Sequence, residues 1–322
     1  MAKITMASAL CIAIREEMRR DERVFVMGED VRTGFMGNTA HLVDEFGVER
    51  VRNTAICENT IVNAALGAAL AGMRPVLDLM FSAFMYVAAN AIITDVARAR
   101  FMFGNQRSVP MVILALNGGG VCAGSSHSES IQAKFMNAPG LKIVMPSTPY
   151  DAKGLMKTAI RDDDPVVILE HIAQASMQGE VPDEEYLIPF GQAVIRNEGK
   201  DVTVVATSSM VQKAMSVAGK LATKGISVEV IDPRTLVPLD KETILKSVAK
   251  TGRLVAMDES NKTCGVCSEI SAMVCEEAFD SLKAPIKRVA ALDVPIPGAP
   301  NLEAFVLPSE QRLTKAIEEI MG

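Results

Sequence analysis

The stretch LKIVMPSTPYDAKGLMKTAIRDDDPVVILE, residues 141–170, decides the fold class of this chain. Two short apolar runs in it, at 142–145 and 166–169, are typical of buried strands. The residues between them predict a helix over 149–161, because Thr148 can act as N-cap, Pro149 suits the first helical position and Asp151 lies in the first turn. A strand, a helix and a second strand in this order indicate an α/β fold with a mainly parallel sheet.

The same alternation continues on both sides of this stretch. Before it, the pattern predicts strands at 24–27, 75–79 and 109–116, and helices at 8–20, 60–71 and 84–103. A segment rich in Gly, Pro and acidic residues interrupts the pattern near residue 175. It resumes with strands at 202–206, 227–231, 254–257 and 286–289, and helices at 210–223, 241–250, 266–279 and 310–320. We therefore predict two α/β domains, 1–180 and 201–322, joined by a linker at 181–200.

Composition excludes several classes of protein. The 322 residues are enough for two domains of about 150 residues each. A net charge of −6 without a basic run argues against nucleic acid as a partner. No stretch of apolar residues is long enough to predict a membrane span, and the N-terminus does not resemble a signal peptide. Six cysteines are too few for a disulfide scaffold, so a cytoplasmic setting is expected.

A glycine-rich segment, NGGGVCAG at 117–124, follows the predicted strand 109–116. The carboxyl ends of parallel strands are where α/β proteins bind ligands, so a loop here could approach a ligand closely. Its glycine spacing is one residue longer than the dinucleotide fingerprint, which makes an NAD site a weak hypothesis. His127 lies just beyond the loop and is either a structural residue or a proton-transfer group.

Two further features allow both a structural and a chemical interpretation. Glu58 precedes a helix of small residues, where it either caps the helix or serves as a carboxyl group of raised pKa. Cys264 and Cys267 form a CxxC at the start of the predicted helix 266–279. A helix N-terminus lowers the pKa of a thiol, but structural thiols are the simpler interpretation.

Taken together, these stretches resemble the beta subunit of the thiamine-diphosphate-dependent decarboxylase component of 2-oxo acid and acetoin dehydrogenase complexes. The resemblance runs almost end to end. It is carried by MGED at 27–30, ICEN at 56–59, AALAGMRP at 68–75, SHS at 126–128, APGLKIV at 138–144, PSTPYDAKGL at 146–155 and AIRDDDP at 159–165. The fold it implies is a pyrimidine-binding domain followed by a transketolase-type C-terminal domain.

The resemblance also implies roles for single residues. Glu58 matches the glutamate that hydrogen-bonds N1′ of the cofactor's aminopyrimidine, and Phe84 matches an aromatic residue that packs near that ring. Phe84 is equally well explained as a core residue. His127 matches a histidine that assists transfer of the acyl group to lipoamide. The family often holds a structural potassium ion through backbone carbonyls, and the matching positions are Met111, Ala159, Ile160, Asp162 and Asp164.

Two segments next to Glu58 and His127 depart from the family pattern. Glu129 and Ser130 follow the histidine where the family commonly has Gln and a small or thiol residue. The segment ICENT at 56–60 differs from the usual pattern, in which a serine precedes the glutamate and a hydrophobic residue and a glycine follow it. The CxxC is not a family feature. Both departures could change the choice of substrate or acyl acceptor.

The sequence lacks the family's signature for binding the diphosphate, and this decides which partner is predicted. The family holds the diphosphate and its Mg²⁺ through a Gly-Asp-Gly…Asn signature on the alpha subunit, and this sequence lacks that signature. The resemblance therefore implies half an active site, completed by an alpha subunit in an α2β2 heterotetramer that serves a lipoyl acyltransferase. The expected enzyme is an oxidoreductase of pyruvate or acetoin type, with branched-chain substrates less favoured. The alternatives are a transketolase-like half-enzyme that transfers a ketol unit and a non-catalytic scaffold subunit.

Overall fold

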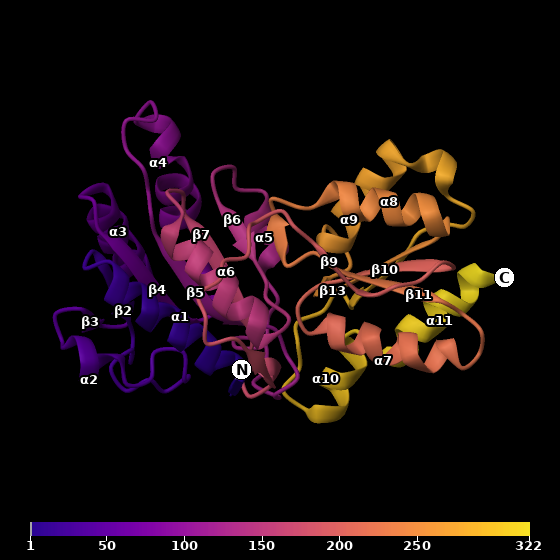
Figure 1. Cartoon of the computed structure of the whole chain (residues 1–322), viewed down its shortest axis with the longest axis horizontal. Coiled ribbons are helices and arrows are strands. Elements are labelled where there is room, and N and C mark those ends of the chain that lie inside the picture. The colour runs from indigo at the N-terminus through magenta and orange to yellow at the C-terminus, as the bar shows by residue number, and fades with distance from the viewer. Residues whose placement is uncertain (1) are drawn as a thin grey trace. The chain divides into compact units, whose positions relative to one another are not determined.

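The computed structural model describes residues 2–322 and divides the chain into two compact units (Figure 1). The first unit comprises the chain up to Asn117 together with Phe135–Phe190. The second unit comprises Gly118–Lys134 and Gly191–Gly322. The change of unit at residues 190 and 191 falls within the range 181–200 expected for the linker. No local pattern in the sequence indicates that the segment 118–134 groups with the second unit.

Six parallel strands form the sheet of the first unit, in the order β6-β7-β5-β4-β2-β3. They are β2 (Val24–Gly28), β3 (Val51–Asn53), β4 (Arg74–Phe81), β5 (Val112–Asn117), β6 (Lys142–Val144) and β7 (Val166–His171). β7 and nearly all of β5 and β2 are buried, which explains their continuous apolar runs. The predicted parallel α/β architecture is confirmed for this unit.

Helices and short segments complete the first unit. The α-helices are α1 (Met6–Arg20), α2 (Leu42–Phe46), α3 (Glu58–Leu70), α4 (Ala97–Met102) and α6 (Pro149–Arg161), and α5 (Gln132–Met136) spans the change of unit after Lys134. A small antiparallel sheet pairs β1 (Ala2–Thr5) with β8 (Gln178–Val181). The side chain of Thr148 accepts a hydrogen bond from the amide of Asp151, so the predicted N-cap of α6 is confirmed.

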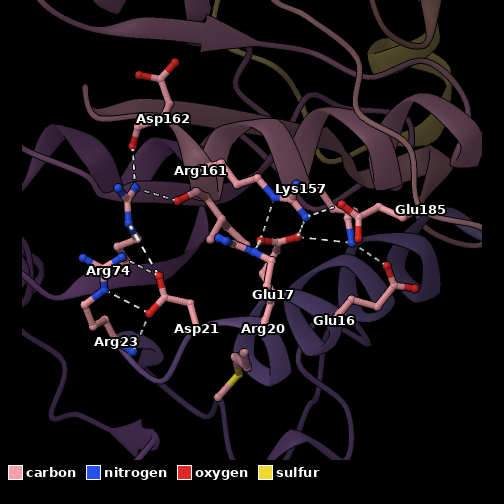
Figure 2. Close-up of polar contacts among 12 residues, drawn as sticks. Glu16, Glu17, Arg20, Asp21, Arg23, Arg74, Lys157, Arg161, Asp162 and Glu185 are labelled. Carbon is pink, nitrogen blue, oxygen red and sulfur yellow. Dashed lines mark hydrogen bonds and ion pairs between the residues drawn. The ribbon is translucent and has the colours of Figure 1, made fainter.

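A buried ion-pair network joins α1 to α6 (Figure 2). Glu17 is fully buried and accepts hydrogen bonds from Arg161 at 2.7 and 3.0 Å and from Arg20 at 2.6 Å. Lys157, also buried, lies 3.1 Å from the same carboxylate. Burial opposes the charge on Glu17, but these hydrogen bonds outweigh it and lower the pKa of Glu17. The Glu17 carboxylate therefore stays ionised and connects α1 to α6 through these hydrogen bonds and ion pairs.

The single helix predicted at 84–103 is confirmed only in part, because the chain is helical from 89 to 102 but a separate 3₁₀ turn precedes this stretch. The structure has a 3₁₀ turn at Ser82–Tyr86, a π-helical turn at Ala91–Val96 and then α4. Ile92, Ile93 and Thr94 are β-branched, which lowers helix propensity in the middle of this stretch. The apolar pattern alone could not reveal the break because the buried positions still repeat at helical spacing.

The second unit contains one five-stranded sheet in the order β14-β13-β10-β11-β9. Its strands are β9 (Val194–Asn197), β10 (Val202–Ala206), β11 (Val228–Asp232), β13 (Leu254–Asn261) and β14 (Lys287–Ala291). Four are parallel, and the edge strand β9 is antiparallel. A short further strand, β12, spans Thr235–Val237. β9 lies within 181–200 and escaped prediction because it is short and only partly buried.

Helices cover both faces of the second sheet. They are α7 (Met210–Ala222), α8 (Lys241–Thr251), α9 (Val266–Glu277), α10 (Pro300–Val306) and α11 (Glu310–Met321). In Figure 1, α8 and α9 lie on one face, and α7 and α11 lie on the other. The core of the unit is built mainly from valines of the strands and aliphatic residues of α7 and α11. Within residues 2–322, no helix has the length and apolar character needed to cross a membrane.

Candidate functional site

Glu58 is the first residue of α3, directly after the segment that follows β3. Its side chain is half-buried, and its carboxylate makes no hydrogen bond or ion pair with any of residues 2–322. It therefore does not cap α3 through a hydrogen bond. At the N-terminal turn, only the Cys57 thiol and the Thr60 hydroxyl pair, at 2.9 Å. The helix dipole favours a negative charge at this position, so Glu58 presents an ionisable group that is available to a ligand.

A second carboxyl group, Glu29, lies close to Glu58. Glu29 follows β2, and the carbonyl of Gly28 accepts a hydrogen bond of 3.0 Å from Thr54, which ties this strand end to the segment leading to Glu58. Burial raises the pKa of Glu29, and the negative charges of Asp30 and Glu58 raise it further. Two carboxyl groups thus share the carboxyl end of β2. Glu29 was not predicted as a site residue, although its position directly after a buried strand was a usable signal.

Phe84 lies in the 3₁₀ turn after β4 rather than on a regular helix. It is half-buried, and its ring meets Phe81 edge to face, with centroids 5.5 Å apart and planes at 71°. Such pairs add to the packing of an aromatic cluster. The contact with Phe81 leaves both the core role and the cofactor-packing role of Phe84 open.

Backbone amides of the glycine-rich loop are already engaged in hydrogen bonds within the chain and are not available to bind an anion. The amide of Gly119 donates to Glu259 at 2.7 Å, and the amides of Gly120 and Cys122 donate to Glu303 at 3.0 and 3.1 Å. These N–H groups therefore bind carboxylates of the chain itself, where a dinucleotide site would bind pyrophosphate. This arrangement contradicts the NAD hypothesis, whereas the expectation that the loop approaches a ligand closely stays a prediction.

His127 lies farther along the same segment, half-buried. The Ser126 hydroxyl is 2.9 Å from its Nδ1, and its own amide donates to the carbonyl of Gly124 at 3.1 Å. The two other histidines have local roles, since His41 pairs with Asp44 and His171 accepts a hydrogen bond from the amide of Ala173. His127 is thus the histidine held in a loop at the end of a central strand, a position that suits proton transfer.

The burial of Cys267 supports the structural interpretation of the CxxC pair. All six cysteines are free thiols. Cys267 is buried in α9, and burial raises the pKa of its thiol well above the usual value. A thiol that stays protonated is a poor nucleophile and a poor redox partner, even next to the exposed Cys264.

The backbone oxygens predicted to hold potassium gather in part around the C-terminal end of α6. The carbonyl of Ile160 accepts a hydrogen bond from Arg74 at 3.0 Å. The carbonyl of Asp162 accepts one from the same side chain at 2.9 Å (Figure 2). The carbonyls of Ala159 and Met111 accept from backbone amides. Each carbonyl oxygen keeps a second lone pair, but Arg74 already places a positive charge at two of the five oxygens, so the potassium site stays a prediction. Among residues 2–322, no three His, Cys, Asp or Glu side chains are placed to hold a metal ion.

Comparison with known proteins agrees with this arrangement. Residues 2–175 match the family described as transketolase, pyrimidine binding domain, and residues 191–313 match transketolase, C-terminal domain. A solved structure described as a split-gene transketolase, inactive beta4 tetramer, superposes with a TM-score of 0.83, covering 99% of this chain and 98% of that one, at 23% identity. At that identity the likeness establishes the fold, which is the two-domain transketolase-type α/β fold.

Curated relatives define the family more narrowly. Over 324 residues, the chain is 43% identical to the 2-oxoisovalerate dehydrogenase subunit beta of Bacillus subtilis, covering 99% of both chains. It is 41% identical to the beta subunit of acetoin:2,6-dichlorophenolindophenol oxidoreductase from the same organism, covering 99% of this chain and 97% of that one. It is 40% identical to the Bacillus subtilis pyruvate dehydrogenase E1 component subunit beta, covering 100% and 99%. The chain belongs to the family of beta subunits of thiamine-diphosphate-dependent 2-oxo acid and acetoin dehydrogenases.

The comparisons do not rank the substrates. Relatives named for 2-oxoisovalerate, acetoin and pyruvate lie within 40–43% identity of this chain. The preference for pyruvate or acetoin that the sequence suggested therefore gains no support. As a beta subunit, the chain works with an alpha subunit within a multienzyme complex.

Proposed function

We propose that this chain provides the aminopyrimidine-binding half of a thiamine diphosphate site in an α2β2 enzyme that acts on a 2-oxo acid or acetoin. The observation that carries the proposal is the half-buried carboxylate of Glu58, which has no hydrogen-bond or ion-pair partner within residues 2–322. This half-buried carboxylate at the start of α3 is free to accept a hydrogen bond from a donor of a bound ligand.

Thiamine diphosphate, when bound, supplies a nucleophilic carbon for attack on the carbonyl of the substrate. Glu58 would bind N1′ of the aminopyrimidine and exchange a proton there, and Phe84 would pack against that ring. Glu29, whose pKa is raised, lies close enough to Glu58 for their charges to interact. We assign the diphosphate and its Mg²⁺ to the alpha subunit, because this sequence has no Gly-Asp-Gly…Asn signature.

His127 has a separate proposed role in acyl transfer. The electron pair left on the substrate carbon by C–C cleavage would break the S–S bond of the lipoyl group on a partner acyltransferase, so that one sulfur takes the acyl group and the other takes a proton to become a thiol. His127 would supply that proton, since imidazole exchanges protons near neutral pH. The two roles divide the reaction, with proton transfer to the cofactor at Glu58 and proton transfer to the acceptor at His127.

The proposed potassium site would be structural. A K⁺ ion bound by the carbonyls of Met111, Ala159, Ile160, Asp162 and Asp164 would join the end of α6 to β5. Its test is thermal unfolding in KCl and in NaCl at equal ionic strength. A melting temperature higher in K⁺ supports the site, and equal melting temperatures in both salts contradict it.

The test of the main proposal uses the complex of this chain with its alpha subunit. The assay follows acylation of a lipoyl domain with pyruvate, 2-oxoisovalerate or acetoin as substrate. Glu58→Gln should lower turnover by at least about 10²-fold, the usual contribution of a positioned proton-transfer group. The matched control is Glu269→Gln, an exposed acid in the first turn of α9, which should leave turnover unchanged. Full turnover by Glu58→Gln, or by this chain without an alpha subunit, would contradict the proposal.

A further inference from the structure

The second sheet has the topology that usually creates a ligand crevice. The chain moves from β10 through α7 to β11 on one side and then through α8 to β13 on the other side of β10. In open parallel sheets, ligands bind at the carboxyl ends of two such strands. Here that crevice would lie where β10 and β13 end, next to Thr207 and to Asp258 and Glu259.

The chain fills this position with its own segment 118–134, here called the histidine loop because it carries His127. Gln132 donates to both carboxylate oxygens of Asp258 at 3.0 Å, and Thr207 donates to the same carboxylate at 2.5 Å. Asp258 and Gln132 are fully buried. The crevice is therefore filled by Gln132 of the histidine loop, which is hydrogen-bonded to Asp258.

Two more carboxylates hold the other parts of the loop. Glu259 accepts from the amide of Gly119 at 2.7 Å and from the Ser130 hydroxyl at 3.2 Å. Glu303 of α10 accepts from the amides of Gly120 and Cys122. Both glutamates are almost fully buried, with exposed fractions of 5% and 3%. Hydrogen bonds from backbone amides to a carboxylate are among the stronger ones in proteins.

These contacts bracket His127 on both sides. Glu303 and Glu259 hold the chain before it, at residues 119–122, and Glu259 and Asp258 hold the chain after it, at residues 130–132. A cavity of about 620 Å³ lies against the loop and is lined on one side by Ser125, Glu129 and Ser130. The loop has open space beside residues 125–130, and the hydrogen bonds to the three carboxylates fix the chain on either side of them.

We propose that Asp258, Glu259 and Glu303 are positioning residues for His127. The second unit thereby sets the geometry of acyl transfer. Its proposed proton-transfer group is His127, and the three carboxylates act only by holding the loop that carries it. This inference rests on the role proposed above for His127. Displacing a reacting group by about 1 Å can slow a reaction by ~10²-fold, so loosening the loop should impair the step that uses His127 and spare the step that uses Glu58.

The test compares two assays on the same complex of this chain with its alpha subunit. The first assay follows oxidation of the 2-oxo acid by 2,6-dichlorophenolindophenol, which takes up the two electrons and needs no lipoyl group. The second follows acylation of a lipoyl domain. Glu303→Gln keeps the size of the side chain but replaces one acceptor oxygen by a donor that faces the Cys122 amide. The Glu303→Gln variant should slow acylation of the lipoyl domain by ~10²-fold at most. Its rate of dye reduction should stay within about twofold of the wild-type rate.

The matched control is Asp240→Asn. Asp240 also accepts hydrogen bonds from two backbone amides of the second unit, those of Ala193 and Thr243, but it does not contact the histidine loop. It should change neither assay. Glu259→Gln should repeat the effect of Glu303→Gln, and Glu303→Asp, which keeps the charge, should restore part of the acylation rate.

The outcomes separate this inference from the proposed function. If Glu58→Gln leaves dye reduction intact, the proposed function itself fails. If Glu58→Gln abolishes dye reduction while Glu303→Gln leaves acylation at the wild-type rate, the positioning role is refuted. Equal losses in both assays for Glu303→Gln and Glu259→Gln would also refute it, because a general structural role would then explain the effect.

Discussion

Glu170 offers the sharpest prediction about stability. It lies on β7, fully buried, and neither of its carboxylate oxygens has a hydrogen-bond partner among residues 2–322. Burial raises its pKa to about 8, and the negative charge of Asp78 on β4 adds to the effect. Asp78 is also buried, and its own pKa is raised to about 6. Both carboxyl groups therefore hold their protons to a higher pH than an exposed carboxyl group does.

The sign of the pH dependence follows from linkage. A carboxyl group whose pKa is raised on folding binds more protons in the folded state than in the unfolded state. The free energy of unfolding therefore falls as the pH rises from the reference value of 4.5 toward the folded value of about 8. At one pKa unit per 1.36 kcal/mol, Glu170 should destabilise the protein by about 1 kcal/mol near pH 5 and by about 5 kcal/mol near pH 9.

Glu170→Gln removes this titration while keeping the shape of the side chain. The difference in unfolding free energy between the variant and the wild type should grow in favour of the variant by about 4 kcal/mol from pH 5 to pH 9. Urea unfolding followed by far-UV circular dichroism measures it, because the chain has no tryptophan. Glu269→Gln, an exposed control, should show no such trend. A constant difference between Glu170→Gln and wild type across this pH range would refute the reasoning.

Three further predictions concern packing and thiol chemistry. Glu17→Ala removes the buried carboxylate that Lys157 and Arg161 share and leaves Lys157 with Glu16 alone on α1, so urea unfolding should show a loss of about 3 kcal/mol, and a loss below about 1 kcal/mol would contradict the network. Thr148→Ala removes the N-cap of α6 and should destabilise by about 1 kcal/mol in the same assay, whereas Thr148→Ser should not. A thiol reagent near pH 8 should label the exposed Cys264 in the native protein and label Cys267 only after unfolding, and rapid native labelling of Cys267 would contradict its burial.

Local signals predicted most of the fold. Helix α6 was predicted with the observed bounds, because Thr148, Pro149 and the following strand β7 all act over short sequence distances. The break in the helix predicted at 84–103 was missed, because the buried positions keep a helical spacing while the backbone changes its hydrogen bonding. Strands β9 and β12 are too short for the alternation of apolar residues to reveal them.

The candidate site was harder to predict than the fold. Glu58 was singled out because it precedes a helix of small residues, His127 because it lies just beyond a strand-end loop, and both because the sequence resembles a known family. The partners of the glycine-rich loop could not be predicted, since Glu259 and Glu303 lie 140 and 183 residues beyond the amides that they bind. Only the three-dimensional structure shows that these amides serve carboxylates of the chain and not a ligand.

The central claim is that Glu58 of this chain carries out proton transfer on a cofactor shared with an alpha subunit. Its most direct measurement is the rate of hydrogen–deuterium exchange at the thiazolium C2 of thiamine diphosphate, in the complex and with each subunit alone. The account predicts rapid exchange only in the complex, slowed by at least about 10²-fold in Glu58→Gln and unchanged in Glu269→Gln. Exchange as fast in Glu58→Gln as in the wild-type complex would contradict the account.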